Sequence, residues 1–481
     1  MNKSIRYTAI FALLLTLALL VNLTVVQGFS QDKYAHNALN RRAFLEMKSQ
    51  PRGQISAGGQ VLAQSVQDAD GFYQRTYPTD TASYGPVIGY LSDVYGASGL
   101  EASQNSILNG SDPSLFASRW IDQLMGKEQS GASIKLTLQP EVQQVAYNGL
   151  AKNGYSGAVV AIRPKTGEIL AMASTPSYDP AAIVGENADS VWKQLNSDPE
   201  SPMLNHATQE TLPPGSTFKV ITTAAGLENG YTPDSSVTGK NEITLPGTNT
   251  TLENYGGQSC GGASTTLRQA FAKSCNTAFV EMGIKVGDKA LTEAAKNFGV
   301  GENYDLGLPT SPGALGDLSD AAARGQSSIG QRDISMSVLQ NAVVAATVAN
   351  GGKRMEPHLV SEVQGADLKT IKKINPKEMN EACDKDTATK LTELMRGSEK
   401  LTAGYRGDDI ASKTGTAEHG EDSRNSNPHA WYIAFGPSKD ADVAVAVVVK
   451  NGGDRGQAAT GGSVAAPIGR AVIDAALRSA R

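Results

Sequence analysis

The chain has 481 residues, enough for two domains, one of them with a sizeable hydrophobic core. Its 43 basic and 48 acidic residues give a net charge of −5 without a long basic run, so a nucleic-acid partner is not expected. The five histidines and three cysteines show neither C-x-x-C nor H-E-x-x-H spacing, so neither a metal nor a cofactor is expected.

An apolar segment over about residues 7–26 follows Lys3 and Arg6 at the N-terminus. It is long enough to span a bilayer as one helix, and the preceding basic residues favour a cytoplasmic N-terminus. A cleaved signal peptide is the alternative, but it would have a shorter apolar region and an A-x-A-like site. We therefore expect a cytoplasmic tip and an uncleaved anchor over 1–28, with the rest of the chain outside the cytoplasm.

Residues 29–150 are polar and rich in turns, which by itself favours a linker-like, partly folded stalk. Near the end of this stretch, apolar residues alternate with polar ones over 133–138, as in a strand. Residues 139–150 then have the period of an amphipathic helix.

From residue 157 the pattern becomes α/β. A hairpin is predicted over 157–174, and helices are predicted after Ser216, over 270–282 and over 334–349. Strands return over 410–417, 430–436 and 442–450, the last with enough Val and Ala for the centre of a sheet. Residues 467–480 are predicted to be a closing helix that starts at a proline. Late strands that pair with the early hairpin imply one sheet with helices on its faces, a mixed α/β (α+β) fold.

Three short motifs in one order carry the chemical signal: Ser216-Thr217-Phe218-Lys219, then Ser274-Cys275-Asn276, then Lys413-Thr414-Gly415-Thr416. Each is weak alone, because S-x-x-K recurs at 30–33, S-x-N at 103–105 and 423–425, and K-T-G at 165–167. Context separates the copies. A proline pair and a glycine precede the serine at 216 and helical spacing follows it, whereas K-T-G at 165–167 joins two predicted strands as a turn.

These residue types are the parts of a serine acyltransferase that works without histidine. Ser216 is the predicted nucleophile at a helix start. Lys219, three residues on and therefore on the same helix face, is the predicted general base. A lysine can act in this way only if burial and a second cation lower its pKa, and Lys413 would be that cation.

The other two motifs complete the predicted site. Ser274 would pass the proton toward the leaving group, and Asn276 would orient the substrate amide and the lysine. Residues 413–416 are expected on an edge strand, where a substrate carboxylate would meet the ammonium of Lys413 and the hydroxyls of Thr414 and Thr416 across Gly415. The backbone N–H groups of Ser216 and Thr416 would form an oxyanion hole.

A histidine-based triad is the rival mechanism. One G-x-S-x-G match occurs at 257–261, but no strand precedes it and no helix follows it directly, so a flexible loop is the better interpretation. Structural roles are preferred for all five histidines, which are His36, His206, His358, His419 and His429. The loop over 418–428 is expected to be a solvated lip of the cleft.

The three cysteines are Cys260, Cys275 and Cys383. An oxidising location permits a disulfide, and the odd number leaves at least one thiol free. We hypothesise a bridge between Cys260 and Cys275, fifteen residues apart, that fixes the loop bearing Ser274; three buried thiols are the alternative.

With these motifs the chain resembles the class B penicillin-binding proteins, which are membrane-anchored peptidoglycan transpeptidases, and within them the short actinobacterial penicillin-binding protein A type. The resemblance extends over nearly the whole chain. Further matching segments are 157–162, 212–219, 329–331, 349–352 and 357–359, together with Arg52-Gly53, Arg75, Tyr77-Pro78 and Gly99-Leu100-Glu101. One departure is Ser56-Ala57-Gly58, where the family usually has an Asp-Arg pair before a glycine.

The resemblance implies that residues 29–150 form a folded, non-catalytic pedestal (dimerisation-like) domain and that 151–481 form the transpeptidase domain. It implies that Ser216 attacks the penultimate D-Ala carbonyl of a pentapeptide stem, that the terminal D-Ala leaves, and that an amine of a neighbouring stem resolves the acyl-enzyme. β-Lactams would acylate the same serine. The segment before the catalytic domain is too short for the glycosyltransferase domain of bifunctional relatives, so a membrane glycosyltransferase of the shape–elongation–division type is an expected partner.

Other functions share the same motifs. A D,D-carboxypeptidase or a serine β-lactamase would let water resolve the acyl-enzyme, but neither normally needs a long pedestal and an anchor. A β-lactam sensor would normally carry several membrane spans and a cytoplasmic effector. A non-catalytic scaffold is disfavoured because all catalytic residue types are present.

Overall fold

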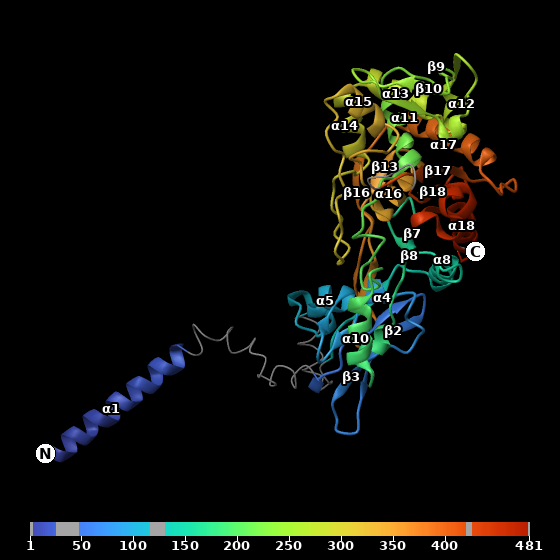
Figure 1. Ribbon diagram of the computed structural model, residues 1–481. Helices are drawn as coiled ribbons and strands as arrows, with labels where there is room; N and C mark the ends of the chain where they lie inside the picture. Colours follow the sequence, from blue (N-terminus) through green and yellow to red (C-terminus); the bar gives the residue numbers. More distant parts are fainter. Residues whose placement is uncertain (1–2, 26–47, 116–129, 420–425, 480–481) are drawn as a thin grey trace.

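The computed structural model describes residues 3–25, 48–115, 130–419 and 426–479. Beyond the N-terminal helix, these residues form two bodies, which Figure 1 shows one above the other. The lower body, the pedestal, contains a six-stranded sheet, and the upper, catalytic body contains a five-stranded sheet.

Helix α1 spans Lys3–Thr24. Lys3 and Arg6 lie in its first turn, and its apolar stretch of 18 residues has a mean hydropathy of 2.0. None of the helix's side chains is buried in the rest of the chain. Among the residues that the structure describes, it is the one helix long and apolar enough to cross a membrane. By length and composition it fits either an anchor or a signal sequence.

The pedestal sheet has the strand order β15-β14-β6-β1-β2-β3. The strands are β1 (Ile55–Ala57), β2 (Gln60–Gln67), β3 (Tyr73–Thr76), β6 (Ser133–Leu136), β14 (Val360–Gln364) and β15 (Thr370–Lys373). Strand β6 runs parallel to β1, with Ile55 opposite Ile134, and antiparallel to β14, with Ile134 opposite Val363. Two strands from the C-terminal half of the chain thus complete the sheet of the N-terminal region.

Short elements surround this sheet. They are α4 (Gly85–Ile88), β4 (Leu91–Ser92), β5 (Gly96–Ala97), α5 (Gly99–Ser103), α6 (Asn105–Leu108), η2 (Pro113–Leu115), α9 (Pro180–Val184) and α10 (Ala188–Ser197). Figure 1 shows α10 beside the pedestal, where Trp192 stacks on Tyr95 with ring centroids 4.3 Å apart. The linker-like interpretation of this region is therefore wrong wherever the structure describes it, because the region forms a sheet whose buried residues, such as Ile55, Leu62 and Ile134, join one core.

Arg52, Arg75 and Glu101, which are among the residues that resemble the family, meet in a buried charge cluster in the pedestal. The Glu101 carboxylate, which has no exposed surface, accepts hydrogen bonds from Arg52 Nε at 2.9 Å and Arg75 Nε at 2.5 Å. Arg75 also donates to the carbonyl of Gly53 at 2.8 Å. Burial lowers the pKa of Arg52, and the Glu101 carboxylate opposes that shift. The cluster joins segments around residues 52, 75 and 101, so it belongs to the structure of the pedestal.

The catalytic sheet has the order β17-β18-β19-β7-β8, and every neighbouring pair is antiparallel. Its strands are β7 (Gly157–Ile162), β8 (Ile169–Thr175), β17 (Ala411–Ala417), β18 (His429–Gly436) and β19 (Val443–Val449). The predicted pairing of the late strands with the early hairpin is confirmed, with β19 at the centre and β17 at the edge. Gly167 turns between β7 and β8 at φ +80°, so K-T-G at 165–167 lies in a hairpin turn as expected.

Helices cover both faces of this sheet. Helices α8 (Pro140–Ala151) and α18 (Ala466–Ser479) pack on one face and bury the alternate valines of β19. Helices α11 (Lys219–Glu228) and α16 (Val338–Ala349) lie on the other face, in the core that continues into the pedestal. Helix α8 lies before the catalytic strands in the sequence and ends at Ala151, and it packs on the catalytic sheet beside α18 (Figure 1).

Three helix boundaries differ from the prediction. The helical segment expected over 270–282 is two helices, α12 (Leu267–Ala272) and α13 (Asn276–Val286), separated by Ser274 at a left-handed φ of +59°. Helix α16 starts at Val338, where a capping box from Ser337 ends the extended chain. Pro467 follows a π-helical turn, η6 (Gly461–Ala465), so the last helical segment begins before the proline.

The remaining elements surround the catalytic body. They are η3 (Gly215–Phe218), β9 (Ser236–Thr238), β10 (Glu242–Thr244), β11 (Thr251–Glu253), η4 (Tyr255–Gly257), β12 (Ser264–Thr266), α14 (Asp288–Asn297), α15 (Ala321–Ser327), β13 (Lys353–Met355), β16 (Glu378–Glu381), α17 (Lys385–Leu401) and η5 (Lys450–Ala458).

Candidate active site

The predicted nucleophile lies in the 3₁₀ turn η3, directly before α11. Gly215 enters this turn at φ +55°, and its N–H donates to the carbonyl of Gly330 at 2.9 Å. A Cβ on Gly330 would lie 2.1 Å from the Gly215 carbonyl oxygen, so only glycine fits there. In a 3₁₀ turn the side chains of residues i and i+3 lie one above the other, so those of Ser216 and Lys219 leave the turn on the same side.

Two fully buried lysines meet at one serine. Lys219 Nζ lies 2.8 Å from the Ser274 carbonyl, 3.2 Å from Ser274 Oγ and 2.8 Å from Asn276 Oδ1. Lys413 Nζ donates to the same Ser274 Oγ at 2.9 Å and to the carbonyl of Thr414 at 2.9 Å. Both side chains have no exposed surface. The structure therefore brings one member of each motif into hydrogen-bond contact.

Burial separates these two lysines from ordinary ones. It is the main cause that lowers the pKa of Lys219 well below its usual value, and the neighbouring charge of Lys413 lowers it further. Burial also lowers the pKa of Lys413, to about 7. Their ammonium groups lie over Phe279 and Phe271, at 5.4 and 5.9 Å from the ring centroids. A positive charge on Lys413 disfavours a second charge beside it, which favours a neutral Lys219 next to a cationic Lys413.

Ser216 itself is partly exposed. Within the described residues, no hydrogen bond joins Ser216 Oγ to Lys219 Nζ. Catalytic hydrogen bonds are often long without substrate and tighten in the complex. The predicted nucleophile is thus the accessible residue of its motif, three positions before a fully buried lysine.

The second motif occupies the break between α12 and α13. Ser274 N–H and Cys275 N–H still donate to the carbonyls of Phe271 and Ala270, at 3.0 and 2.9 Å, which closes the end of α12. Asn276 then begins α13, and its Nδ2 donates to the carbonyl of Glu253 at 3.1 Å. That bond orients the amide so that Oδ1 faces Lys219. The break, which the helical periodicity hides, is what points Ser274 at the lysines.

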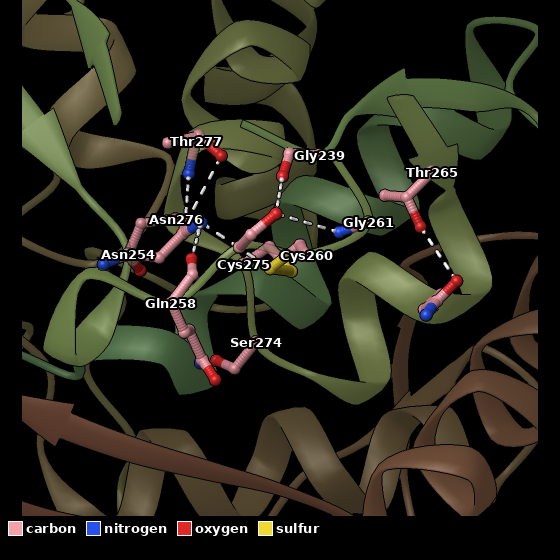
Figure 2. The surroundings of a disulfide bond; sticks show 12 residues. Gly239, Asn254, Gln258, Cys260, Gly261, Thr265, Ser274, Cys275, Asn276 and Thr277 are labelled. Atoms are coloured by element: carbon pink, nitrogen blue, oxygen red, sulfur yellow. Dashed lines mark hydrogen bonds between the residues drawn. A yellow bond between two sulfur atoms is a disulfide. The ribbon is translucent and has the colours of Figure 1, made fainter. Parts of the chain in front are cut away.

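A disulfide closes the loop behind Ser274. The sulfur atoms of Cys260 and Cys275 are bonded, with Cα atoms 6.3 Å apart (Figure 2). Asn254 supports the same loop: its Oδ1 accepts from Thr277 N–H at 3.0 Å and its Nδ2 donates to the Gln258 carbonyl at 2.9 Å. Cys383 is buried away from this pair as a free cysteine, and desolvation raises the pKa of its thiol to about 12.

We expect Cys260→Ala together with Cys275→Ala to lower the free energy of unfolding by about 3 kcal/mol, the chain-entropy effect of a loop of about fifteen residues. Urea unfolding of the variant against the unchanged protein measures this difference. Non-reducing peptide mapping of the unchanged protein should recover residues 260 and 275 in one linked peptide, with Cys383 as the free thiol. Recovery of three free thiols would show that the pair is reduced in solution.

Strand β17 carries the third motif along the edge of the catalytic sheet. Lys413 and Gly415 face η3, and a Cβ on Gly415 would lie 2.8 Å from the Pro214 carbonyl oxygen, so the glycine allows the strand to approach the nucleophile segment. Thr414 and Thr416 are partly exposed. A Cβ on Gly215 would lie 3.1 Å from the Thr416 carbonyl oxygen, which places that end of β17 against η3.

Among the residues that the structure describes, no histidine is bonded to the serine of the rival motif. The G-x-S-x-G match at 257–261 lies in a loop between β11 and β12, and Ser259 Oγ donates to the carbonyl of Gly239. His206 Nδ1 pairs with Glu210 at 2.8 Å, and His419 stacks on His429 with ring centroids 3.9 Å apart. Desolvation lowers the pKa of His429 to about 3. Of the loop expected to be a lip at 418–428, residues 420–425 lie outside the described residues, as does His36.

The sequence did not single out the side chains behind β17. Ser412 faces the opposite side of the strand from Lys413, where it donates to the buried carboxylate of Glu399 in α17. The only sequence signal for this contact is Ser412's place beside the K-T-G motif, since Glu399 lies in an ordinary amphipathic helix.

Known proteins share this architecture. The model of the penicillin binding protein transpeptidase domain matches residues 157–474, and that of the penicillin binding protein A dimerisation domain matches 52–134. The chain is 48% identical to the peptidoglycan D,D-transpeptidase PbpA of Mycolicibacterium smegmatis and 46% identical to that of Mycobacterium tuberculosis, covering 99% of each. The structure of penicillin-binding protein A from M. tuberculosis as a ceftriaxone acyl-enzyme complex has a TM-score of 0.86 and 46% identity, covering 90% of this chain and 100% of that one.

The chain therefore belongs to the penicillin-binding protein transpeptidases, peptidoglycan D,D-transpeptidases that react through an acylated serine. Its N-terminal region matches the penicillin binding protein A dimerisation domain, and the two relatives named above are both PbpA.

Proposed function

We propose that this chain cross-links peptidoglycan stem peptides through an acyl-enzyme on Ser216. The observation that carries the proposal is the meeting of Lys219 and Lys413 at Ser274, beside the turn that bears Ser216. Ser216 Oγ attacks the penultimate D-Ala carbonyl, the terminal D-Ala leaves, and an amine of a second stem peptide takes the acyl group. The peptide bond made replaces the peptide bond broken, so no cofactor is needed.

In this proposal, neutral Lys219 is the general base. A neutral amine has two N–H donors and one lone pair, and the donors fit the Ser274 carbonyl and Asn276 Oδ1, both of which can only accept. The lone pair then faces the serine hydroxyls. It takes the Ser216 proton as the Oγ–C bond forms.

Ser274 returns that proton to the leaving amine. Its hydroxyl accepts from Lys413 at 2.9 Å and lies 3.2 Å from Lys219 Nζ, so it can donate to the amine and accept from the ammonium in turn. Lys413 keeps the positive charge that lowers the pKa of Lys219, and its ammonium, with the hydroxyls of Thr414 and Thr416, binds the substrate carboxylate. The N–H groups of Ser216 and Thr416 hold the oxyanion.

A fluorescent penicillin separates this proposal from its rivals. With purified protein that lacks α1, we expect a covalent adduct that mass spectrometry maps to Ser216 and that persists for many minutes. Rapid loss of the adduct would favour a serine β-lactamase. On a pentapeptide donor with an amine acceptor, release of D-Ala should come with cross-linked product; D-Ala release alone would favour a D,D-carboxypeptidase.

We also propose that α1 is an uncleaved anchor that holds the catalytic body outside the cytoplasm. Lys3 and Arg6 lie at the start of the helix, which favours the orientation with the N-terminus inside. The chain should remain in the membrane fraction after alkaline carbonate extraction, whereas a protein with a cleaved signal peptide would be released.

Cross-linking needs glycan strands that another activity makes, so we propose a membrane glycosyltransferase of the shape–elongation–division type as partner. The pedestal offers a surface for it, an open cavity of about 1520 Å³ between β3, β4, α6 and α9. A photo-crosslinking residue at Val94, 74% exposed on the cavity lining, should capture a co-expressed glycosyltransferase of that type. The same residue at Tyr255, 56% exposed on the catalytic body, is the control and should not.

A further inference from the structure

A buried polar cluster lies behind the strand that carries the third motif. Glu399, near the end of α17, has no exposed surface. Its Oε2 accepts from Ser412 Oγ of β17 and from the Tyr432 hydroxyl of β18, the latter at 3.0 Å. Its Oε1 accepts from Arg470 Nε of α18 at 2.7 Å, and Arg470 also donates to the carbonyl of Ala403 at 2.8 Å.

The cluster holds an edge strand from its far side. Strand β17 has a strand neighbour on one side only, in the register Ser412 opposite Ala434 and Thr414 opposite Tyr432. Successive side chains of a strand point to opposite faces, so Ser412 enters this cluster while Lys413 enters the site. The Ser412 hydrogen bond therefore fixes the residue next to the buried ammonium.

Stability alone does not account for such a cluster. A buried ion pair is often no more stabilising than apolar side chains of the same size, because both charges lose their water. Arg470 and Glu399 come from two helices, and their pairing fixes the carboxylate in place. Ser412 of β17 and Tyr432 of β18 then donate to the same oxygen, Glu399 Oε2. These two hydrogen bonds hold β17 and β18 at a fixed position relative to α17, and so fix the distance between β17 and Ser274.

We infer that the Glu399–Ser412 hydrogen bond is a positioning device for acylation, which sets the Lys413 ammonium against Ser274. This inference rests on the proposed function of the Ser216 site. Lys413 Nζ reaches Ser274 Oγ at 2.9 Å, and a shift of about 1 Å in such a group can cost about 100-fold in rate. Glu399 and Ser412 touch neither the nucleophile nor the substrate, so they act through the backbone of β17.

Ser412→Ala tests the inference, with Tyr432→Phe as the matched control. Both variants remove one donor from the same carboxylate oxygen, but only the first removes the hydroxyl that β17 itself contributes. We expect Ser412→Ala to lower the second-order rate constant for acylation by a fluorescent penicillin at least about ten-fold, at a melting temperature close to that of Tyr432→Phe. Tyr432→Phe should stay within about three-fold of the unchanged protein, and Ser412→Thr, which keeps the hydroxyl, should restore most of the rate.

The pH profile of acylation gives a second readout. If Ser412→Ala moves the Lys413 ammonium, the pH limits of its rate should shift, whereas a merely less stable protein keeps the same profile with fewer active molecules. Equal acylation by Ser412→Ala and the unchanged protein would overturn the inference, as would losses in both variants that follow their melting temperatures. If the unchanged protein forms no adduct on Ser216, the proposed function fails first, which keeps the two failures distinct.

Discussion

Ser216→Ala should abolish the covalent adduct with a fluorescent penicillin and lower transpeptidation by about 10⁴- to 10⁶-fold. Without Oγ no acyl-enzyme forms, and only binding and orientation remain to favour the reaction. Ser216 is partly exposed in η3, so the variant should fold normally. Gel fluorescence and intact mass measure the adduct, cross-linked product from a pentapeptide donor and an amine acceptor measures transpeptidation, and thermal unfolding tests the fold.

The matched control for this variant is Ser259→Ala, the serine of the competing G-x-S-x-G match. Its hydroxyl accepts from Gly262 N–H at 3.0 Å in a surface loop, so the adduct should form at nearly the rate of the unchanged protein. A persistent adduct in Ser216→Ala would contradict the assigned nucleophile. Loss of labelling in Ser259→Ala, but not in Ser216→Ala, would indicate that Ser259 is the nucleophile.

Lys219→Met should lower the acylation rate by about 10²- to 10⁴-fold, the usual contribution of a general base. Methionine fills the same buried space but cannot take a proton. Lys285→Met, which changes an exposed lysine in the last turn of α13, is the control and should leave the rate unchanged. Stopped-flow labelling over a range of penicillin concentrations measures the rate, and a Lys219→Met protein that acylates normally would contradict the role of this amine.

The two lysines also set the expected pH dependence. In the unchanged protein, acylation should fall on the acid side as Lys219 gains a proton, at a pH well below the ordinary lysine pKa, because burial and Lys413 lower it. It should fall on the alkaline side as Lys413 loses its proton, from a pKa of about 7 in the free protein. A profile that rises steadily to pH 10 would contradict this assignment.

Stability supplies an independent check on the same group. The unfolded chain binds a proton at Lys219 up to about pH 10.4, whereas the folded chain has already lost it, so unfolded protein holds more protons over that window. The free energy of unfolding of the unchanged protein should therefore rise with pH between the lowered pKa of folded Lys219 and about pH 10.4. Lys219→Met should lack this part of the slope, measurable as the difference in free energy of unfolding between pH 7 and 10.

Local patterns in the sequence were enough to predict the chemistry and most of the catalytic sheet. The Val and Ala alternation over 442–450 marks a strand buried on both faces, and β19 is the central strand. The three motifs carry the site because each lies at a structural boundary: a helix start, a break and an edge strand. Their roles remain predictions that the variants above test.

What local patterns missed depends on distant contacts. The spacing over 270–282 stays helical through Ser274, because the break is made by one left-handed residue and leaves the apolar period intact. The pairing of β14 with β6 joins residues more than 220 positions apart, and strand pairing at that separation has no local signal. Likewise, nothing near residue 399 indicates that its carboxylate would meet Ser412.

Strands β14 and β15 come late in the sequence, and this determines when the pedestal sheet can be completed. Strand β6 lies in the middle of the pedestal sheet, between β1 and β14, so until residues 360–364 have been synthesised and paired it presents an open edge. Unpaired edges invite association with other chains. The pedestal sheet therefore cannot be completed before residues 360–373 are in place, and a truncated chain that lacks them would leave that edge of β6 unpaired.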